Sequence, residues 1–252
     1  MNPKHWLISY DLFERHYVTA QLIRECRCFV ARVLDVGGRA GLLAGFTHCS
    51  VTSVNVDASA DVRYDGQRLP FATNAFDAVT AIDTLEHLPR HRRLDFVREC
   101  LRVSAKVTIL AAPFGSPEHA ESEARLNRLY TALHGAPHRY LSEHVQHGLP
   151  DLSELQALIA GSGVSSWRLL FAGDYRREAA HFAAAARATA LACGGGGVPA
   201  RLAGLWAYAR SRAIFNRLRL SESPLPHANR FYLQLSKAGA APPASGASSA
   251  RH

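Results

Sequence analysis

The sequence has few cysteines, no long apolar run and no excess of acids. Its five cysteines are odd in number and show no paired Cys-x-x-Cys spacing, so neither a disulfide framework nor a cysteine zinc site is expected. The most apolar stretch, residues 182–198, is mostly alanine and glycine and contains Arg187, which argues against a membrane-spanning helix. The first ten residues show no secretory pattern. These absences predict a cytoplasmic protein with free thiols.

The positive charge of the chain is concentrated in one segment. There are 29 lysines and arginines against 21 aspartates and glutamates, a net charge of +8. Residues 174–230 contain nine arginines and three acids, so most of the excess lies there and favours an acidic partner. A second group of arginines lacks the interleaved aromatic residues of single-strand binding sites, so we expect it on the surface and expect no specific nucleic-acid partner: Arg90, Arg92, Arg93 and Arg98.

The stretch that organises the chain is residues 33–41, an apolar run that reaches Asp35 and continues into a cluster of glycines. The apolar residues suit a buried strand, and the glycines release the backbone for a tight turn: Gly37, Gly38 and Gly41. A helix expected to begin near Ala40 would add unpaired N–H groups to a nucleotide pocket at the carboxyl edge of a parallel sheet. No register satisfies Gly-x-Gly-x-x-Gly, so the pattern disfavours a dinucleotide.

Two further motifs follow this stretch in order. Val54-Asn55-Val56-Asp57 reads as a second strand that ends in an acid, and residues 65–88 contain Asp65-Gly66, Phe76-Asp77-Ala78-Val79 and Leu85-Glu86-His87-Leu88. Together with the Asp-x-Gly-x-x-x-Gly order, they resemble class I S-adenosylmethionine-dependent methyltransferases, specifically the type 11 methyltransferase domain family. The resemblance covers about residues 30–115, and a last strand near 231–236 would complete the domain.

The resemblance implies an α/β fold with a Rossmann-like, seven-stranded, mostly parallel sheet, flanked by helices and carrying a helical insertion before the last strand. The chain of 252 residues is long enough for one such domain with an added lobe. We divide it into an N-terminal helical cover (1–28), the methyltransferase core (29–173), a helical insertion lobe (174–228), the last strand of the core (229–237) and a disordered tail (238–252).

The resemblance also implies a cofactor, S-adenosylmethionine, and a set of residues around it. Asp35 would lie near the methionine portion, and the glycines would allow close approach. Asp57 would accept hydrogen bonds from the ribose hydroxyls. Asp65 would accept from the adenine amino group while the Gly66 N–H meets a ring nitrogen, although Asp65 could equally cap a turn. Ile82, at the end of the fourth predicted strand, completes the expected cofactor-binding set.

The chemistry is expected where that fourth strand ends. If the acceptor is a hydroxyl, His87 is the first candidate for the base, because a neutral imidazole can take its proton near pH 7. Asp83 and Glu86 are alternative bases, and a structural role for His87 is equally compatible with the sequence. We expect a small polar acceptor such as a sugar or a lipid-linked glycan intermediate, and O-methylation is favoured.

Several alternatives stay open. Arg39 stands where the family usually has glycine, so a non-catalytic S-adenosylmethionine-binding protein with a degenerate glycine loop is the second hypothesis.

Five histidines fall within residues 119–147, where His144-x-x-His147 beside Glu143 could bind metal. Solvated or hydrogen-bonding histidines fit the spacing better, and no metal site is predicted. A helix over 199–219, with Trp206 on its apolar face, could contact the inner membrane surface peripherally or pack on the host domain. The oligomeric state is undetermined.

Overall fold

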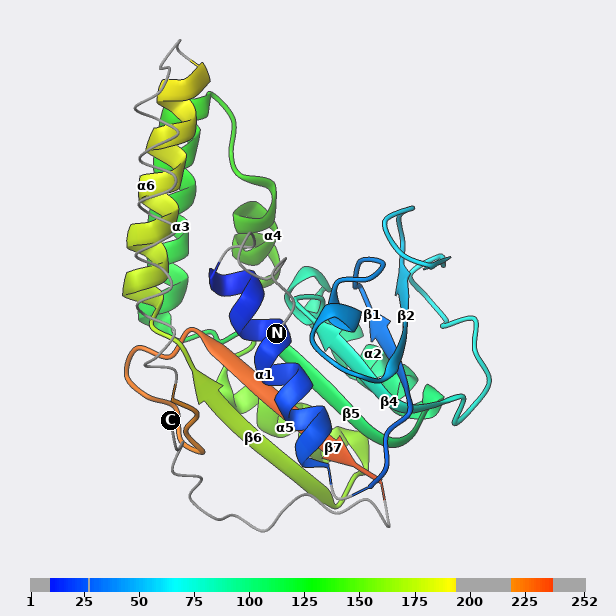
Figure 1. The fold of residues 1–252 in the computed structure, drawn as a ribbon. Helices are drawn as coiled ribbons and strands as arrows, with labels where there is room; N and C mark the ends of the chain where they lie inside the picture. The colour runs from blue at the N-terminus through cyan, green and yellow to red at the C-terminus, as the bar shows by residue number, and fades with distance from the viewer. Residues whose placement is uncertain (1–9, 27, 194–218, 238–252) are drawn as a thin grey trace.

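The computed structural model describes residues 10–26, 28–193 and 219–237, and the elements along this part of the chain form one sheet with helices on its faces (Figure 1). The seven strands lie in the order β3-β2-β1-β4-β5-β7-β6. Their bounds are β1 Arg32–Val36, β2 Ser50–Asn55, β3 Val62–Arg63, β4 Phe76–Ile82, β5 Ser104–Pro113, β6 Ser166–Ala172 and β7 Arg230–Ser236. The strands β1 to β5 pair in parallel, whereas β7 is antiparallel to both β5 and β6. The predicted fold class is confirmed.

The helices divide between the faces and one end of the sheet. Their bounds are α1 Tyr10–Glu25, α2 Arg90–Val103, α3 Pro117–His134, α4 Arg139–His147, α5 Leu152–Ser162 and α6 Tyr175–Cys193. Two short 3-10 helices, η2 Leu43–Gly45 and η3 Leu85–His87, follow β1 and β4. The helix α6, part of the predicted insertion, lies alongside α3 (Figure 1). Among the helices described here, none is both long and apolar enough to cross a membrane.

Side chains alternate between the two faces along the central strands, so there are two apolar cores, one on each face of the sheet. In β1, Leu34 and Val36 join the core shared with α2 and α5, whereas Val33 joins the core beneath α1. Successive strand residues point to opposite faces, so a strand that is covered on both sides is apolar throughout. Asp35 is therefore an exception: it is buried within such a strand.

The predicted helix near Ala40 is wrong. After the glycine turn the chain forms only η2, and β2 begins at Ser50. Residues 37–49 must make the turn and return along the sheet, which is close to the shortest length that a parallel crossover takes. The short η2 takes the place of the expected helix, so the expected helix dipole does not contribute at this turn.

Two predicted segments lie outside the described residues. The proposed interfacial helix, 199–219, is described only at Arg219, and its Trp206 is not described. The predicted disordered tail, 238–252, also falls outside.

Candidate functional site

Most of the predicted site residues lie at the carboxyl ends of β1, β2 and β4, whereas Asp65 and Gly66 follow β3. The order β2-β1-β4 places the crossover reversal between β1 and β4, since chain connections leave β1 toward β2 on one side and reach β4 on the other. Open α/β sheets bind ligands at such a switch point, in the crevice outside the strand ends. The glycine turn, Asp57 and the segment 83–87 all follow strands that end there.

The glycine turn is shaped by close contacts that exclude larger side chains. Gly37 has a φ of +79°, and a β-carbon there would overlap the Thr84 hydroxyl. A β-carbon on Gly38 would overlap the carboxylate of Asp35. The Asn55 side-chain amide donates to the Gly37 carbonyl at 3.0 Å and so ties the turn to the end of β2. Sequence reasoning missed Asn55 and Thr84, because polar residues beside a motif give no signal of what they contact.

Asp35 lies under this turn with its charge poorly compensated. Its side chain is 1% exposed, and the Thr80 hydroxyl donates to Oδ1 at 2.9 Å. Oδ2 is buried without a hydrogen-bond partner among the described residues. Burial raises the pKa of Asp35 to about 7, since removal from water disfavours the carboxylate, and the Thr80 hydrogen bond opposes this only in part. The group can therefore change protonation near neutral pH.

Arg39 causes no backbone strain in the turn. Its side chain is exposed, and the described non-glycine residues with positive φ are Asn74 and Asp83 alone. The guanidinium contributes, with that of Arg139, to holding the pKa of Asp57 below its usual value, although hydrogen bonds from Ser59 are the main cause. Arginine at this position is thus compatible with an intact turn.

The two acids predicted to bind ribose and adenine are both exposed. Asp57 accepts a hydrogen bond from the Ser59 N–H at 2.8 Å, and Asp65 accepts one from the Gln67 N–H at 2.9 Å. Asp65 thus caps its own turn, as the alternative interpretation proposed, and Gly66 within that turn has a φ of +79°. Ile82 is buried in the core beneath α1, so any cofactor contact there would involve its backbone.

Asp83 is held in an ion-pair network. It pairs with Arg15 of α1 and with Arg230 of β7, and Asp11 pairs with both arginines, at 3.0 Å and 2.9 Å respectively. The residue has a φ of 48°, and its N–H donates to the Ala111 carbonyl. The two guanidinium groups balance the carboxylates of Asp11 and Asp83, which favours a role for Asp83 in anchoring α1 over the strand ends.

Glu86 and His87 come together with His144, which α4 carries. The potential ligand atoms of these three side chains all lie within 4.8 Å of one another. His87 Nδ1 lies 2.7 Å from Glu143 Oε2, and its Nε2 lies 3.9 Å from Glu86 Oε1. Burial lowers the pKa of His87, and His144 lowers it further, so the neutral imidazole is favoured. Burial raises the pKa of Glu86.

Arg93 corrects the prediction that the arginines of α2 are all on the surface. Its side chain is fully buried, and it ion-pairs with Glu154 at 2.8 Å. It also donates to the carbonyls of Leu88, after η3, and of Gly148, after α4, at 3.0 Å and 2.6 Å. One cation thereby fixes the ends of the two segments that carry the Glu86, His87 and His144 side chains.

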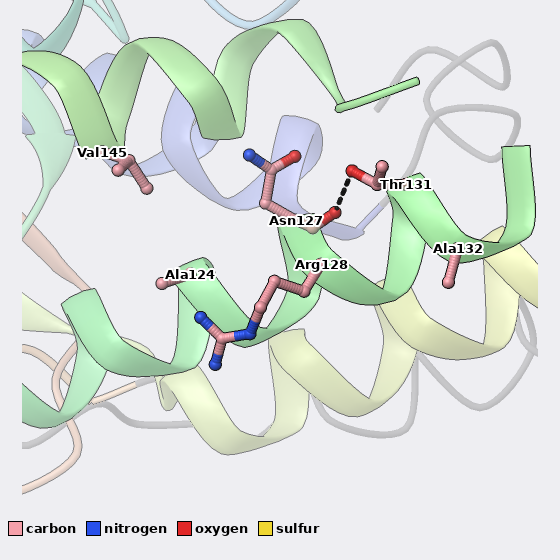
Figure 2. A pocket seen from close by; sticks show the side chains of 6 residues that line it. All are labelled: Ala124, Asn127, Arg128, Thr131, Ala132 and Val145. Atoms are coloured by element: carbon pink, nitrogen blue, oxygen red, sulfur yellow. Dashed lines mark hydrogen bonds between the residues drawn. The ribbon is translucent and has the colours of Figure 1, made fainter. Parts of the chain in front are cut away.

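A separate hollow of about 460 Å³ lies between α3 and α4 (Figure 2). It contains none of the predicted site residues and is lined by Ala124, Asn127, Arg128, Thr131, Ala132 and Val145. Its wall is largely apolar, and the Thr131 hydroxyl donates to the Asn127 carbonyl of its own helix. We place the functional site at the strand ends instead, where buried ionisable groups converge.

Residues 19–111 match the model of a family described as a methyltransferase domain. A comparison with curated proteins found no match. Among solved structures, the fold is similar to a methyltransferase of Archaeoglobus fulgidus (TM-score 0.52, 12% identity), with 93% of this chain and 97% of that chain covered. It is also similar to a possible histamine N-methyltransferase of Thermotoga maritima (0.52, 10% identity), with 90% and 92% covered. These identities establish the fold and no more. The family match confirms the resemblance and, with it, S-adenosylmethionine as the cofactor.

Proposed function

Because the chain carries a class I methyltransferase domain that uses S-adenosylmethionine, we propose that it methylates a hydroxyl group of a small polar acceptor, such as a sugar or a lipid-linked glycan intermediate. The observation that carries this proposal is the juxtaposition of the glycine turn with the group of Glu86, His87 and His144, here called the η3 cluster. The glycine turn and Asp57 would hold the cofactor. Glu86 and His87 lie just after the end of β4, the strand that pairs with β1.

Methyl transfer from a sulfonium is an in-line displacement, so the main tasks of the protein are alignment and the exclusion of water. The acceptor oxygen forms a bond to the methyl carbon as the bond from carbon to sulfur breaks, and the electron pair returns to sulfur. The hydroxyl proton must leave in the same process. His87 is the base in this proposal, since its neutral form is favoured and Glu143 faces its other ring nitrogen.

The side chains near His87 support a polar acceptor. Tyr140 lies 5.4 Å from the His87 ring, measured between centroids, and is half exposed. Glu143, which lies beside His87, pairs with Arg139 at 3.0 Å. Hydroxyl and charged groups near His87 favour an acceptor that forms hydrogen bonds over an apolar one. The rival hypothesis of a non-catalytic binding protein depended on Arg39, whose ordinary backbone gives it no support.

Replacing Asp57 with alanine should weaken S-adenosylmethionine binding roughly ten- to hundred-fold, the range expected when a charged hydrogen-bond acceptor is removed. Calorimetric titration measures this change directly. Arg39→Gly is the matched control, since Arg39 is also exposed at this turn, and its affinity should stay within about two-fold of the natural chain. An unchanged affinity in Asp57→Ala would refute the ribose assignment, and a large loss in Arg39→Gly would make Arg39 a ligand residue.

Turnover tests the acceptor class. The full chain would be incubated with S-adenosylmethionine and a panel of sugars, lipid-linked glycans, amines and thiols, and S-adenosylhomocysteine would be quantified by mass spectrometry. The proposal expects product with a hydroxylated member, with the added mass on oxygen. Product with only amines or thiols would contradict O-methylation.

A further inference from the structure

The cluster of Glu86, His87 and His144 contains buried polar atoms that the protein leaves without partners. Glu86 is 1% exposed and His144 is 9% exposed. Glu86 Oε2 and His144 Nε2 are both buried without a hydrogen-bond partner in the described part of the chain. An unpaired polar atom in such a place costs free energy, so its retention calls for a ligand that satisfies it.

The outer ring nitrogens of the two histidines face carboxylates. His144 Nδ1 lies 3.0 Å and 3.1 Å from the two carboxylate oxygens of Glu123. His87 Nδ1 lies 2.7 Å from Glu143, which is itself bound by Arg139. A carboxylate on one ring nitrogen fixes the tautomer that leaves the lone pair on the other nitrogen, the arrangement that surrounds metal-bound histidines. The Nε2 of His144 is therefore prepared as a ligand, and the Nε2 of His87 lies 3.9 Å from Glu86 Oε1.

We propose that Glu86, His87 and His144 bind a divalent transition-metal ion, with Zn²⁺ as the best-suited ion. Two imidazoles and one carboxylate are a known ligand set for zinc, and this set leaves a coordination position open for water or substrate. The charge of the cluster agrees with this assignment, because Glu86, Glu123 and Glu143 bring three carboxylates around two histidines. A divalent cation among them would offset their mutual repulsion.

Sequence spacing pointed to a different residue. The His144-x-x-His147 pattern would pair His144 with His147, but the group of ligand atoms found here includes His87 from η3 in its place. The contact forms because α4 packs against η3, which brings together residues far apart in the chain. His147 lies on the same helix as His144 and supplies a matched control.

The consequence for catalysis rests on the proposed function. With the ion in place, an acceptor hydroxyl at its open position would lose its proton to solvent, and the proton step assigned above to His87 would pass to the ion. The oxygen would then form its bond to the methyl carbon as the carbon–sulfur bond breaks, which releases S-adenosylhomocysteine. Metal binding itself does not depend on this step and can be measured alone.

The test is calorimetric titration of the full, chelator-treated chain with zinc chloride, with metal content checked by mass spectrometry. We expect one Zn²⁺ per chain. His144→Ala and Glu86→Gln should each weaken zinc binding by on the order of 100-fold or more, and Glu123→Gln about 10- to 100-fold, since it only positions His144. His147→Ala should bind zinc like the natural chain. Glu86→Gln keeps the side-chain volume. If His144→Ala fails to fold, the zinc affinity of Glu86→Gln tests the site in its place.

Two results would overturn the inference: no stoichiometric zinc binding by the natural chain, or equal losses in His147→Ala and His144→Ala, which would indicate surface histidines only. In the first case His144 would be a structural histidine that pairs with Glu123. The same preparations would be titrated with S-adenosylmethionine. Cofactor binding without zinc refutes the metal site alone, whereas zinc binding without cofactor refutes the proposed function alone.

Discussion

Replacing Arg93 with methionine should lower the free energy of unfolding by about 3 to 5 kcal/mol, the cost of removing one partner from a buried ion pair. Arg93 is fully buried, and its loss would leave Glu154 uncompensated and the carbonyls of Leu88 and Gly148 without their donor. Methionine keeps much of the side-chain volume, so the effect would report the polar contacts and not a cavity. Urea unfolding followed by circular dichroism measures it.

Arg92→Met is the control for this prediction. Arg92 is the preceding residue of α2 and is exposed, so its replacement should change the free energy of unfolding by no more than about 0.5 kcal/mol. If Arg93→Met and Arg92→Met behaved alike, Arg93 would not be the residue that fixes η3 and α4.

The second large effect is a pH-dependent destabilisation caused by Asp35. Its pKa is about 7 in the folded protein, against an ordinary value of 3.8. Between these values the unfolded chain ionises while the folded chain keeps its proton, so the free energy of unfolding falls as the pH rises from about 4 to about 7. The difference of three pKa units sets an upper limit of about 4 kcal/mol, and the full loss applies above pH 7.

Asp35→Asn isolates this contribution, because asparagine has nearly the same shape and does not titrate. The free energy of unfolding of the natural chain minus that of Asp35→Asn should decrease by up to about 4 kcal/mol between pH 4 and pH 7.5. Denaturant titrations without cofactor at several pH values measure this difference. A difference that is flat across the range would mean that Asp35 ionises normally beneath the glycine turn.

The strands β1, β2 and β4 were predictable because an apolar run followed by glycine or an acid marks the end of a strand and the edge at which ligands gather. The helix near Ala40 was predicted wrongly because the glycine motif says nothing about the length of the crossover that follows it. Arg93 is instructive in another way. It lies four residues before Val97 on the buried stripe of α2, so the helical period placed it inward while its charge argued for the surface.

The η3 cluster could be predicted only in part. The motif around Leu85-Glu86-His87-Leu88 identified two of its residues, since both follow a strand end. His144 could not be connected to them, because no local pattern reports that α4 packs against η3. The spacing of His144 and His147 instead suggested a partner on the same helix. His144 joins the cluster because α4 packs against η3, a long-range contact that no local sequence pattern indicates.

The assignment of the cofactor site can be tested by calorimetric titration of the full chain with S-adenosylmethionine. We expect saturable binding at one site per chain with a dissociation constant in the micromolar range, and comparable binding of S-adenosylhomocysteine. If a folded chain did not bind the cofactor at millimolar concentration, the assignment would be contradicted. The chain would then have the methyltransferase fold, but the glycine turn, Asp57 and Asp35 would not form a cofactor site.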